Sequence, residues 1–286
     1  MKRREFGYSM MVSAMAASVS RARAETKGMN IKFGACDWTL KLTADPASLD
    51  LAKKIGLDGV QVDFGSEPSA GGKLPLFDEK LQETFLAKSA ELGVAIPSLA
   101  MGVLNKVALK NDAAAELWMM EGVQVAQKMR TPVVLLAFFG NGDLRNDEAG
   151  VQSVIEKLRK LAPKAQAAGV TYGVESWLQV PDLERILDAV NSPAIKVYYD
   201  VGNMDKEGED ICAAIRRLGK ERICEFHAKD YTDLYGKGNI DFAKVRDAIR
   251  DIAYSGWMQI EGTKLPNGVE EGVRYDLEHL RSVFAK

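Results

Sequence analysis

Two kinds of segment alternate along residues 29–286, and their order constrains the fold more than any other feature of the chain. Short runs rich in β-branched and aromatic residues are typical of buried strands, and each is followed by a longer run with the apolar period of an amphipathic helix. Eight such pairs follow one another without a low-complexity linker. This alternation predicts a parallel sheet covered by helices.

Eight strand–helix pairs in a chain of this length predict a single-domain (β/α)8 barrel, the TIM barrel. The predicted strands are Ile31–Cys36, Gly59–Phe64, Ala95–Met101, Pro132–Phe139, Thr171–Ser176, Ile195–Val201, Ile223–Ala228 and Trp257–Glu261. The predicted helices are Ala47–Ile55, Asp78–Leu92, Ala113–Met129, Glu148–Ala168, Asp182–Val190, Asp210–Leu218, Phe242–Ile252 and Val269–Phe284. An open doubly wound sheet is the alternative, but no glycine-rich dinucleotide loop follows the first strand.

The first 24 residues have the pattern of an export signal. Lys2-Arg3-Arg4-Glu5-Phe6 is basic, a mildly apolar stretch over 8–19 follows, and Ala22-Arg23-Ala24 matches an A-x-A cleavage site. The apolar stretch is too short to span a bilayer, and the paired arginines resemble a twin-arginine signal. We therefore expect a barrel domain over 29–286 that is exported to the periplasm or secreted, with no stable membrane insertion after cleavage. A disordered tail or an uncleaved anchor is the alternative.

The charge balance argues against one class of partner. The formal net charge is −2, with 38 Lys and Arg against 40 Asp and Glu, so no basic excess is present to neutralise a phosphate backbone. Nucleic acid is therefore not an expected partner. The 3 cysteines have no paired spacing and predict no disulfide framework. The sequence does not decide the oligomeric state, and a homo-oligomer remains open.

Four predicted strands carry a residue of a metal-ligating type at or next to their carboxyl end. These residues are Glu175, Asp200, His227 and Glu261. They are separated by 25, 27 and 34 positions, close to the roughly 30 residues of one strand–helix unit. Because the carboxyl ends of barrel strands meet at one mouth, we expect the four side chains to converge. Each residue alone has a common structural explanation, such as a cap, an ion pair or a packed imidazole, and the shared spacing is what favours a metal site.

The ligand types indicate which ion would bind. Three carboxylates and one imidazole suit Mn²⁺ or Mg²⁺, with Co²⁺ or Zn²⁺ as alternatives. An octahedral ion held by four protein groups keeps positions for two substrate oxygens. The expected substrate group is a carbonyl beside a hydroxyl, polarised by the ion acting as a Lewis acid.

Five segments resemble the sugar (phosphate) isomerase/epimerase family of the xylose isomerase-like barrel superfamily. They are Val174-Glu175, Tyr199-Asp200-Val201-Gly202-Asn203, Phe226-His227-Ala228-Lys229-Asp230, Gly236 to Phe242 and Gly256 to Glu261. The resemblance covers residues 29–286 and is strongest from residue 170 onward. It implies that the four strand-end residues bind one divalent ion, and that Glu175 and Glu261 also act as the acid/base pair.

This implied assignment is consistent with the chemistry of sugar isomerisation. Moving or inverting a centre beside a carbonyl requires removal of a carbon-bound proton, and a divalent ion stabilises the resulting enediolate. One carboxylate removes the proton and another returns it. We expect the fifth and eighth strands to lie across the mouth, so that the two glutamates address opposite faces of the intermediate. Two-face access gives epimerisation and one-face transfer gives aldose–ketose isomerisation, and the sequence does not choose between them.

Further residues are candidates for substrate binding. Trp38 and Trp177 are expected to form apolar walls for a sugar ring, as are the phenylalanines that end the fourth strand. Asp63 is a candidate for binding sugar hydroxyls. Lys229 is expected either to hold a substrate oxygen or to form a salt bridge at the rim.

Two positions depart from the ketose 3-epimerases and hydroxypyruvate isomerases of the superfamily. Those enzymes carry a histidine three residues after the sixth-strand Asp, where this chain has Asn203, and a further Glu that residues 176–182 lack. Asn203 donates and accepts hydrogen bonds but does not titrate, and it remains a candidate for substrate binding. The resemblance therefore leaves the substrate open.

Other functions compete with a metal-dependent sugar isomerase or epimerase. A lyase or deglycosidase on keto-sugars shares the proton-removal step and then expels a leaving group. A non-catalytic secreted sugar-binding protein would retain the metal without turnover. Apurinic endonucleases of the superfamily need many histidines, and this chain has 2. Export and the lack of a phosphate-cradling glycine loop favour an unphosphorylated small carbohydrate as the partner.

Overall fold

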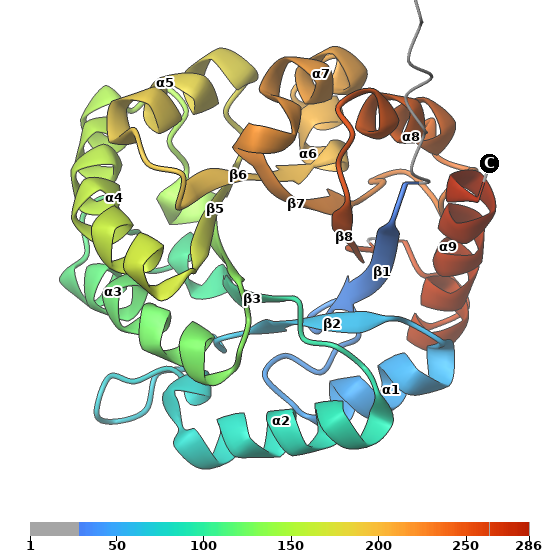
Figure 1. Ribbon diagram of the computed structural model, residues 1–286, viewed down its shortest axis with the longest axis horizontal. Helices are drawn as coiled ribbons and strands as arrows, with labels where there is room; N and C mark the ends of the chain where they lie inside the picture. Colours follow the sequence, from blue (N-terminus) through green and yellow to red (C-terminus); the bar gives the residue numbers. More distant parts are fainter. Residues whose placement is uncertain (1–28, 263, 286) are drawn as a thin grey trace, which may run out of the picture.

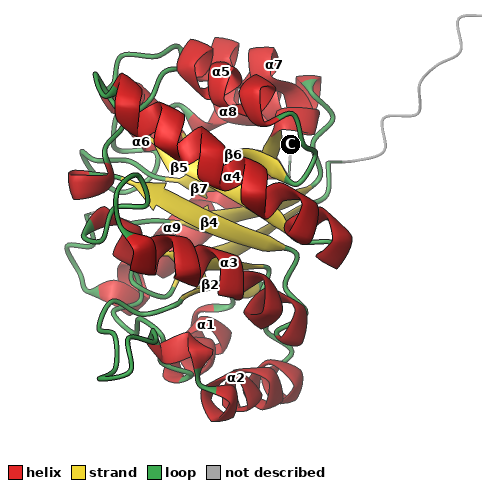
Figure 2. Cartoon of the chain, turned by 90° about the vertical axis from the view of Figure 1, so that its left-hand side faces the viewer, coloured by secondary structure: helices red, strands yellow, loops and turns green. Residues whose placement is uncertain are grey.

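A computed structural model of the protein, which describes residues 29–262 and 264–285, closes eight parallel strands into a barrel in sequence order. Strand β1 pairs with β8 through five residue pairs, which completes the ring. Helices form an outer ring around the strands (Figure 1), and the side view shows the same two layers (Figure 2). The predicted (β/α)8 fold is confirmed. The predicted export signal, residues 1–24, lies outside the described residues.

The strands and helices follow the predicted order. The strands are β1 Ile31–Cys36, β2 Gly59–Asp63, β3 Ser98–Met101, β4 Val133–Phe138, β5 Thr171–Ser176, β6 Ile195–Asp200, β7 Ile223–Ala228 and β8 Gly256–Ile260. The helices are α1 Ala47–Ile55, α2 Glu79–Leu92, α3 Ala113–Lys128, α4 Glu148–Ala168, α5 Val180–Val190, α6 Val201–Lys206, α7 Ile211–Arg222, α8 Phe242–Asp251 and α9 Val269–Phe284. No helix of the described part of the chain is long and apolar enough to cross a membrane.

Two differences from the predicted elements have physical reasons. Strand β3 begins at Ser98 rather than at Ala95, because Pro97 has no N–H for the ladder and Ala95 makes only an isolated bridge to Gly59. The short helix α6 was not predicted, since the apolar period is invisible over six residues. Asp200 caps this helix by accepting a hydrogen bond from the Asn203 N–H, at 2.8 Å.

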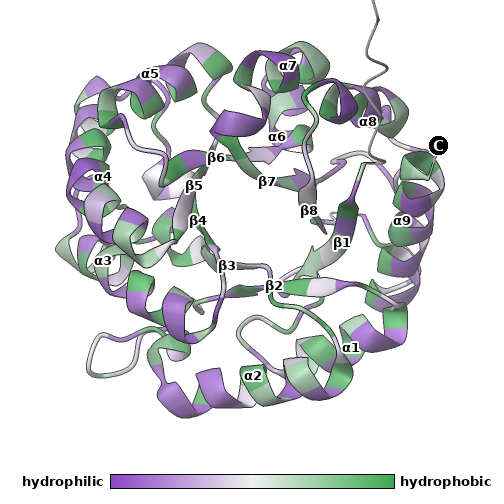
Figure 3. Cartoon of the chain, viewed as in Figure 1, coloured by the Kyte–Doolittle hydropathy of each residue, from purple (hydrophilic) through white to green (hydrophobic). Residues whose placement is uncertain are grey.

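The apolar core lies between the strands and the outer helices. Helix α8 is typical, because its buried residues Phe242, Val245, Ala248 and Ile249 recur at helical spacing on one face. Hydrophilic and hydrophobic residues accordingly alternate along the outer helices (Figure 3). Each fully buried apolar side chain of this kind contributes about 1.5–3 kcal/mol. This layer packs the helices against the barrel.

The barrel interior below the mouth is polar rather than purely apolar. The Tyr198 hydroxyl donates to Glu225 Oε2 at 2.7 Å, and Gln259 Nε2 donates to Glu225 Oε1 at 3.3 Å. Burial raises the pKa of Glu225. A Cβ at Gly34 would overlap the side-chain oxygen of Gln259, so the inward approach of this glutamine requires glycine on β1. A hydrogen-bonded layer therefore supports the mouth from below.

Candidate metal centre and active-site pocket

The four predicted ligands occupy the carboxyl ends of four consecutive strands. Glu175 and His227 lie near the ends of β5 and β7, and Asp200 is the last residue of β6. Glu261 follows β8 directly, where its N–H donates to the Ala228 carbonyl at 2.8 Å. Each residue offers one ligand atom, and these atoms all lie within 4.8 Å of one another. The convergence expected from the spacing is therefore observed.

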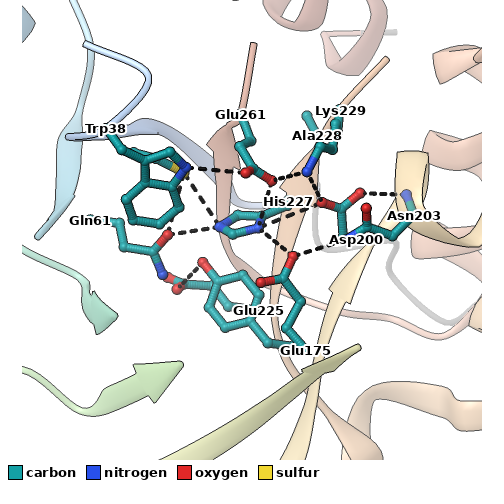
Figure 4. Close-up of polar contacts among 12 residues, drawn as sticks. Trp38, Gln61, Glu175, Asp200, Asn203, Glu225, His227, Ala228, Lys229 and Glu261 are labelled. Atoms are coloured by element: carbon teal, nitrogen blue, oxygen red, sulfur yellow. Dashed lines mark hydrogen bonds and ion pairs between the residues drawn. The ribbon is translucent and has the colours of Figure 1, made fainter. Parts of the chain in front are cut away.

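One ring nitrogen of His227 faces the three carboxylates (Figure 4). Nδ1 lies 3.1 Å from Glu175 Oε1, 3.3 Å from Glu261 Oε2 and 3.7 Å from Asp200 Oδ2. The imidazole is fully buried, and the Tyr198 ring packs against it with centroids 4.5 Å apart. The carboxylates thus surround Nδ1 on the side of the ring where an ion would bind.

The other ring nitrogen of His227 is held by a glutamine that sequence reasoning missed. Nε2 lies 2.7 Å from Gln61 Oε1 and 3.4 Å from Cys36 Sγ. A neutral imidazole has one N–H, and donating it from Nε2 to an amide oxygen leaves the Nδ1 lone pair directed at the carboxylates. Hydrogen bonds of this kind fix the tautomer of metal-ligating histidines. The only signal for Gln61 is a polar residue inside the apolar run of β2.

The ligand atoms fit a divalent cation. Asp200 Oδ2 is buried and accepts no hydrogen bond, although the Lys229 ammonium lies 3.4 Å away. Three carboxylates brought together out of water are costly unless cations compensate their charge. Their oxygens with one imidazole nitrogen form a donor set suited to Mg²⁺ or Mn²⁺. The four residues therefore form a candidate metal site.

The acidic groups of this cluster titrate differently. Burial raises the pKa of Glu175 to about 7, against the opposing attraction of His227. Burial also acts to raise the pKa of Glu261, but attraction to Lys229 and His227 outweighs it and holds this pKa well below its usual range. Burial opposes the charged form of His227, while Cys36 and Glu175 raise its pKa above the ordinary value. A divalent cation competes with that proton for Nδ1.

A cavity of about 430 Å³ opens beside the cluster. Glu175 and Glu261 line it, and so do the five predicted substrate-binding residues, Trp38, Asp63, Trp177, Asn203 and Lys229. Of the two phenylalanines predicted to face the cavity from the fourth strand, Phe139 lines it. Phe138 does not, because it is buried in the outer core. Tyr231, which was not predicted, also lines the cavity. The volume is within the range of small-molecule sites.

Three of the lining residues also donate hydrogen bonds to Glu175 or Glu261, two of the candidate metal ligands. Trp38 Nε1 donates to Glu261 Oε1 at 3.1 Å, and Lys229 Nζ donates to Glu261 Oε2 at 2.8 Å. Asn203 Nδ2 donates to Glu175 Oε1 at 3.1 Å, while its Oδ1 accepts the Tyr231 hydroxyl at 2.6 Å. Lys229 therefore forms the salt bridge considered as one alternative and borders the cavity as well.

The loop between β7 and α8 brings Lys229 and Tyr231 to the cavity. Asp230 accepts hydrogen bonds from the N–H groups of Thr232 and Ile240, each at 2.9 Å. Asp276 of α9 accepts the Tyr235 N–H at 2.9 Å, and burial raises the pKa of Asp276 to about 7. Two buried aspartates thus anchor the backbone that carries these two side chains.

Comparison with known proteins agrees with this architecture. The family model described as xylose isomerase-like TIM barrel matches residues 49–283. The chain belongs to this family. A crystal structure of D-psicose 3-epimerase with D-tagatose, from Clostridium cellulolyticum H10, superposes with a TM-score of 0.74 at 17% identity, covering 88% of this chain and 99% of that one. This likeness supports the fold.

Two curated relatives are sugar-type epimerases. SgbU of Escherichia coli K12, whose assignment as an L-ribulose-5-phosphate 3-epimerase is itself provisional, is 25% identical over 239 residues, which cover 76% of this chain and 82% of SgbU. The 2-epi-5-epi-valiolone 7-phosphate 2-epimerase of an Actinoplanes species is 25% identical over 204 residues, or 71% and 73% of the two chains. The relatives are enzymes, and so is this protein.

Proposed function

We propose that the protein is a divalent-metal-dependent sugar isomerase or epimerase. The observation that carries the proposal is the convergence of Glu175, Asp200, His227 and Glu261, with ligand atoms within 4.8 Å of one another, at the wall of a cavity. The epimerases among the relatives and the family membership support the reaction class. A purely structural cluster would not need two of its carboxylates to line a cavity.

The four residues would hold the ion through one nitrogen and carboxylate oxygens. When bound, the ion supplies Lewis acidity to a carbonyl oxygen and a neighbouring hydroxyl of the sugar. Mn²⁺ and Mg²⁺ are the proposed ions, since the donor set is rich in oxygen. Gln61 keeps the His227 ring in the tautomer that presents Nδ1.

Glu175 and Glu261 are the proposed acid/base pair. Both line the cavity, and they approach His227 Nδ1 from β5 and from the end of β8, with two strands between them in the ring. One carboxylate removes the proton beside the substrate carbonyl, and the other returns a proton to the enediolate. Trp38 and Lys229 hold the Glu261 carboxylate through one hydrogen bond to each oxygen, which fixes its orientation. Asn203 plays the same part for Glu175.

The place of action is part of the proposal. The basic start, the short apolar stretch and the Ala22-Arg23-Ala24 site support export by a twin-arginine-type signal. The barrel would then act in the periplasm or outside the cell. Fractionation of cells that express the full chain tests this, and a protein that stays cytoplasmic with residues 1–24 attached would contradict it.

Metal analysis joined to deuterium exchange tests the reaction. The purified protein is analysed for bound metal and then incubated in D₂O with a panel of aldoses and ketoses, and the products are followed by NMR. We expect one ion per chain and deuterium at a single carbon beside the carbonyl. Chelation should abolish the exchange and Mn²⁺ should restore it. Undiminished turnover after chelation would exclude the proposed reaction. So would a metal-loaded protein that neither exchanges deuterium into any of the sugars nor converts any of them.

A further inference from the structure

We propose that the cavity takes an unphosphorylated sugar, and that Asp63 binds its hydroxyl groups at the side of the pocket away from the metal ligands. The inference rests on the proposed function and names the substrate class of the same site. It follows from the position of one carboxylate and from the charges of the residues around the cavity.

Asp63 is the last residue of β2, which lies opposite β6 in a closed ring of eight strands. Asp63 therefore lies across the mouth from the β6 position of Asp200, while β1 separates β2 from β8, which leads into Glu261. The side chain is 5% exposed and lines the cavity. Its Oδ1 accepts the Gly65 N–H at 2.7 Å, and its Oδ2 accepts the Gly102 N–H at 2.9 Å. A carboxylate offers about four acceptor sites, so each oxygen keeps capacity for one sugar hydroxyl.

The surrounding backbone is built closely around this carboxylate. A Cβ at Gly102 would lie 2.7 Å from Asp63 Oδ2, so the N–H can approach only because residue 102 is glycine. Behind it, Asp37 Oδ2 accepts the Asp63 N–H at 2.9 Å and the Ala44 N–H at 2.8 Å. Asp63 is thus held in one orientation, which is what recognition of two neighbouring hydroxyls requires.

Asp63 carries a negative charge at neutral pH. Burial raises its pKa to about 6, which still leaves the carboxylate mostly ionised at pH 7. Burial and the proximity of Asp63 also raise the pKa of Asp37 well above its ordinary value. The carboxylate that borders the cavity is therefore available as a hydrogen-bond acceptor at neutral pH.

The charges around the cavity disfavour a phosphate. Among the described residues that line it, Asp63, Glu175 and Glu261 are acidic and Lys229 is the single cation. The Lys229 ammonium forms ion pairs with Glu261, at 2.8 Å, and with Asp200, at 3.4 Å. Phosphate sites use several cations or backbone N–H groups that have no other acceptor. The N–H of Gly102 does not meet this condition, because it donates to Asp63.

Two further cations lie near the mouth without supplying a phosphate site. Arg145 stacks 4.5 Å from the Trp177 ring centre, but its guanidinium pairs with Asp143 at 2.7 Å and with Glu207 at 2.9 Å. The Lys206 ammonium lies 5.0 Å from the Trp177 ring centre and its side chain is exposed, so water and salt screen its charge. Both curated relatives described above are named for phosphorylated substrates. The charges around this cavity instead favour an unphosphorylated sugar.

Calorimetric binding to the manganese-loaded protein tests the proposal directly. The probes are D-fructose, D-tagatose, D-psicose and D-ribulose, with D-fructose 6-phosphate and D-ribulose 5-phosphate as their charged counterparts. We expect at least one neutral ketose to bind at least tenfold more tightly than the phosphate of the same sugar. Equal or tighter binding of the phosphates, or no binding by any neutral ketose, would overturn the proposal.

Variants then test the role of Asp63. Asp63→Asn should weaken binding of the neutral ketose about tenfold, with little change in manganese affinity. The ratio of the affinity for the neutral ketose to the affinity for its phosphate should therefore fall. The matched control is Asp58→Asn, because Asp58 also accepts a backbone N–H, from Phe33 at 2.9 Å, but at the other end of β2. Equal effects of the two substitutions, or unchanged sugar binding by a folded Asp63→Asn protein, would remove Asp63 from the proposal.

Binding and turnover separate this inference from the proposed function. A protein that binds neutral ketoses selectively but exchanges no deuterium refutes the isomerase and keeps the substrate class. A protein that converts sugar phosphates in D₂O keeps the isomerase and refutes the substrate class. The comparison of neutral ketoses with their phosphates uses the unmodified protein. The substrate class is therefore tested even if the Asp63→Asn protein misfolds.

Discussion

The two halves of the barrel mouth use one scaffold for different purposes. The ends of β5 to β8 carry the candidate ligand cluster, the only group of this kind among the described residues. The ends of β1 to β4 instead carry Asp63, which accepts backbone N–H groups, and side chains that pack, such as Phe138. Identical strand geometry therefore does not impose chemistry on a strand end, and the side chains decide it.

The halves are nevertheless joined by direct contacts. Gln61 of β2 bonds to His227, and Trp38, just after β1, bonds to Glu261. The first half thus orients candidate ligands that the second half supplies. The following substitutions measure how complete this division of labour is.

The largest effect should come from the ligand-bearing half. Glu175→Gln keeps one oxygen for the ion but loses the proton acceptor, so we expect the rate of deuterium exchange to fall by about 10²–10⁴-fold. Glu148→Gln is the control, because Glu148 pairs with Arg185 on the exposed face of α4. A loss below tenfold for Glu175→Gln would show that another group transfers the proton.

The next effect concerns the loop that completes this half. Asp276 has its pKa raised to about 7 in the folded protein, so between its unfolded pKa, near 4, and pH 7 the folded state binds more protons. The contribution of Asp276 to stability is therefore present below about pH 4 and is lost as the pH rises toward 7, by about 2–4 kcal/mol.

Asp276→Asn should remove this loss, because an amide oxygen still accepts the Tyr235 N–H. We expect the variant to gain stability relative to the unmodified protein at pH 8 but not at pH 4.5, measured by urea unfolding at both pH values. A difference between the two proteins that does not change with pH would contradict the assignment.

Gln61→Leu tests whether the first half acts on the metal. It removes the acceptor of the His227 Nε2–H, and we expect manganese affinity to fall by about 10–100-fold in a competition titration. Gln82→Leu is a matched control, since Gln82 is also buried but bonds to the Leu76 carbonyl in the outer layer. Similar losses for both variants would indicate a general packing defect instead.

The smallest effect is expected at Trp38. Trp38→Phe keeps an aromatic ring at the cavity but loses the 3.1 Å hydrogen bond to Glu261. One such bond is worth about 1 kcal/mol, so kcat/KM should fall by about fivefold with manganese affinity nearly unchanged. Trp257→Phe, at the opposite end of the barrel, should have no effect on kcat/KM.

The ligand-bearing half was predictable because its signal lies along the chain. Glu175, Asp200, His227 and Glu261 each end an apolar run, and their separations match one repeat unit, so the spacing and the barrel rule together place them at one point. Helix ends such as Gly93 and Gly169 were predictable for a similar local reason, and both adopt the left-handed conformation.

The other features depend on contacts between distant residues. Gln61 and His227 are 166 positions apart, and nothing in the sequence around either residue indicates the partner. Tyr231 reaches the cavity on a loop whose backbone Asp230 and Asp276 hold, and no local pattern reveals these contacts. Which of Phe138 and Phe139 faces the cavity depends on the pleat of β4, and a one-residue shift would reverse the answer.

The pairing of β1 with β8 has a consequence for how the centre is assembled. A fragment that contained only β5 to β8 would possess every ligand, yet it would lack both Gln61 and Trp38. Cation binding at the proposed centre would thus report ring closure: during refolding, full affinity should appear only after β1 has paired with β8.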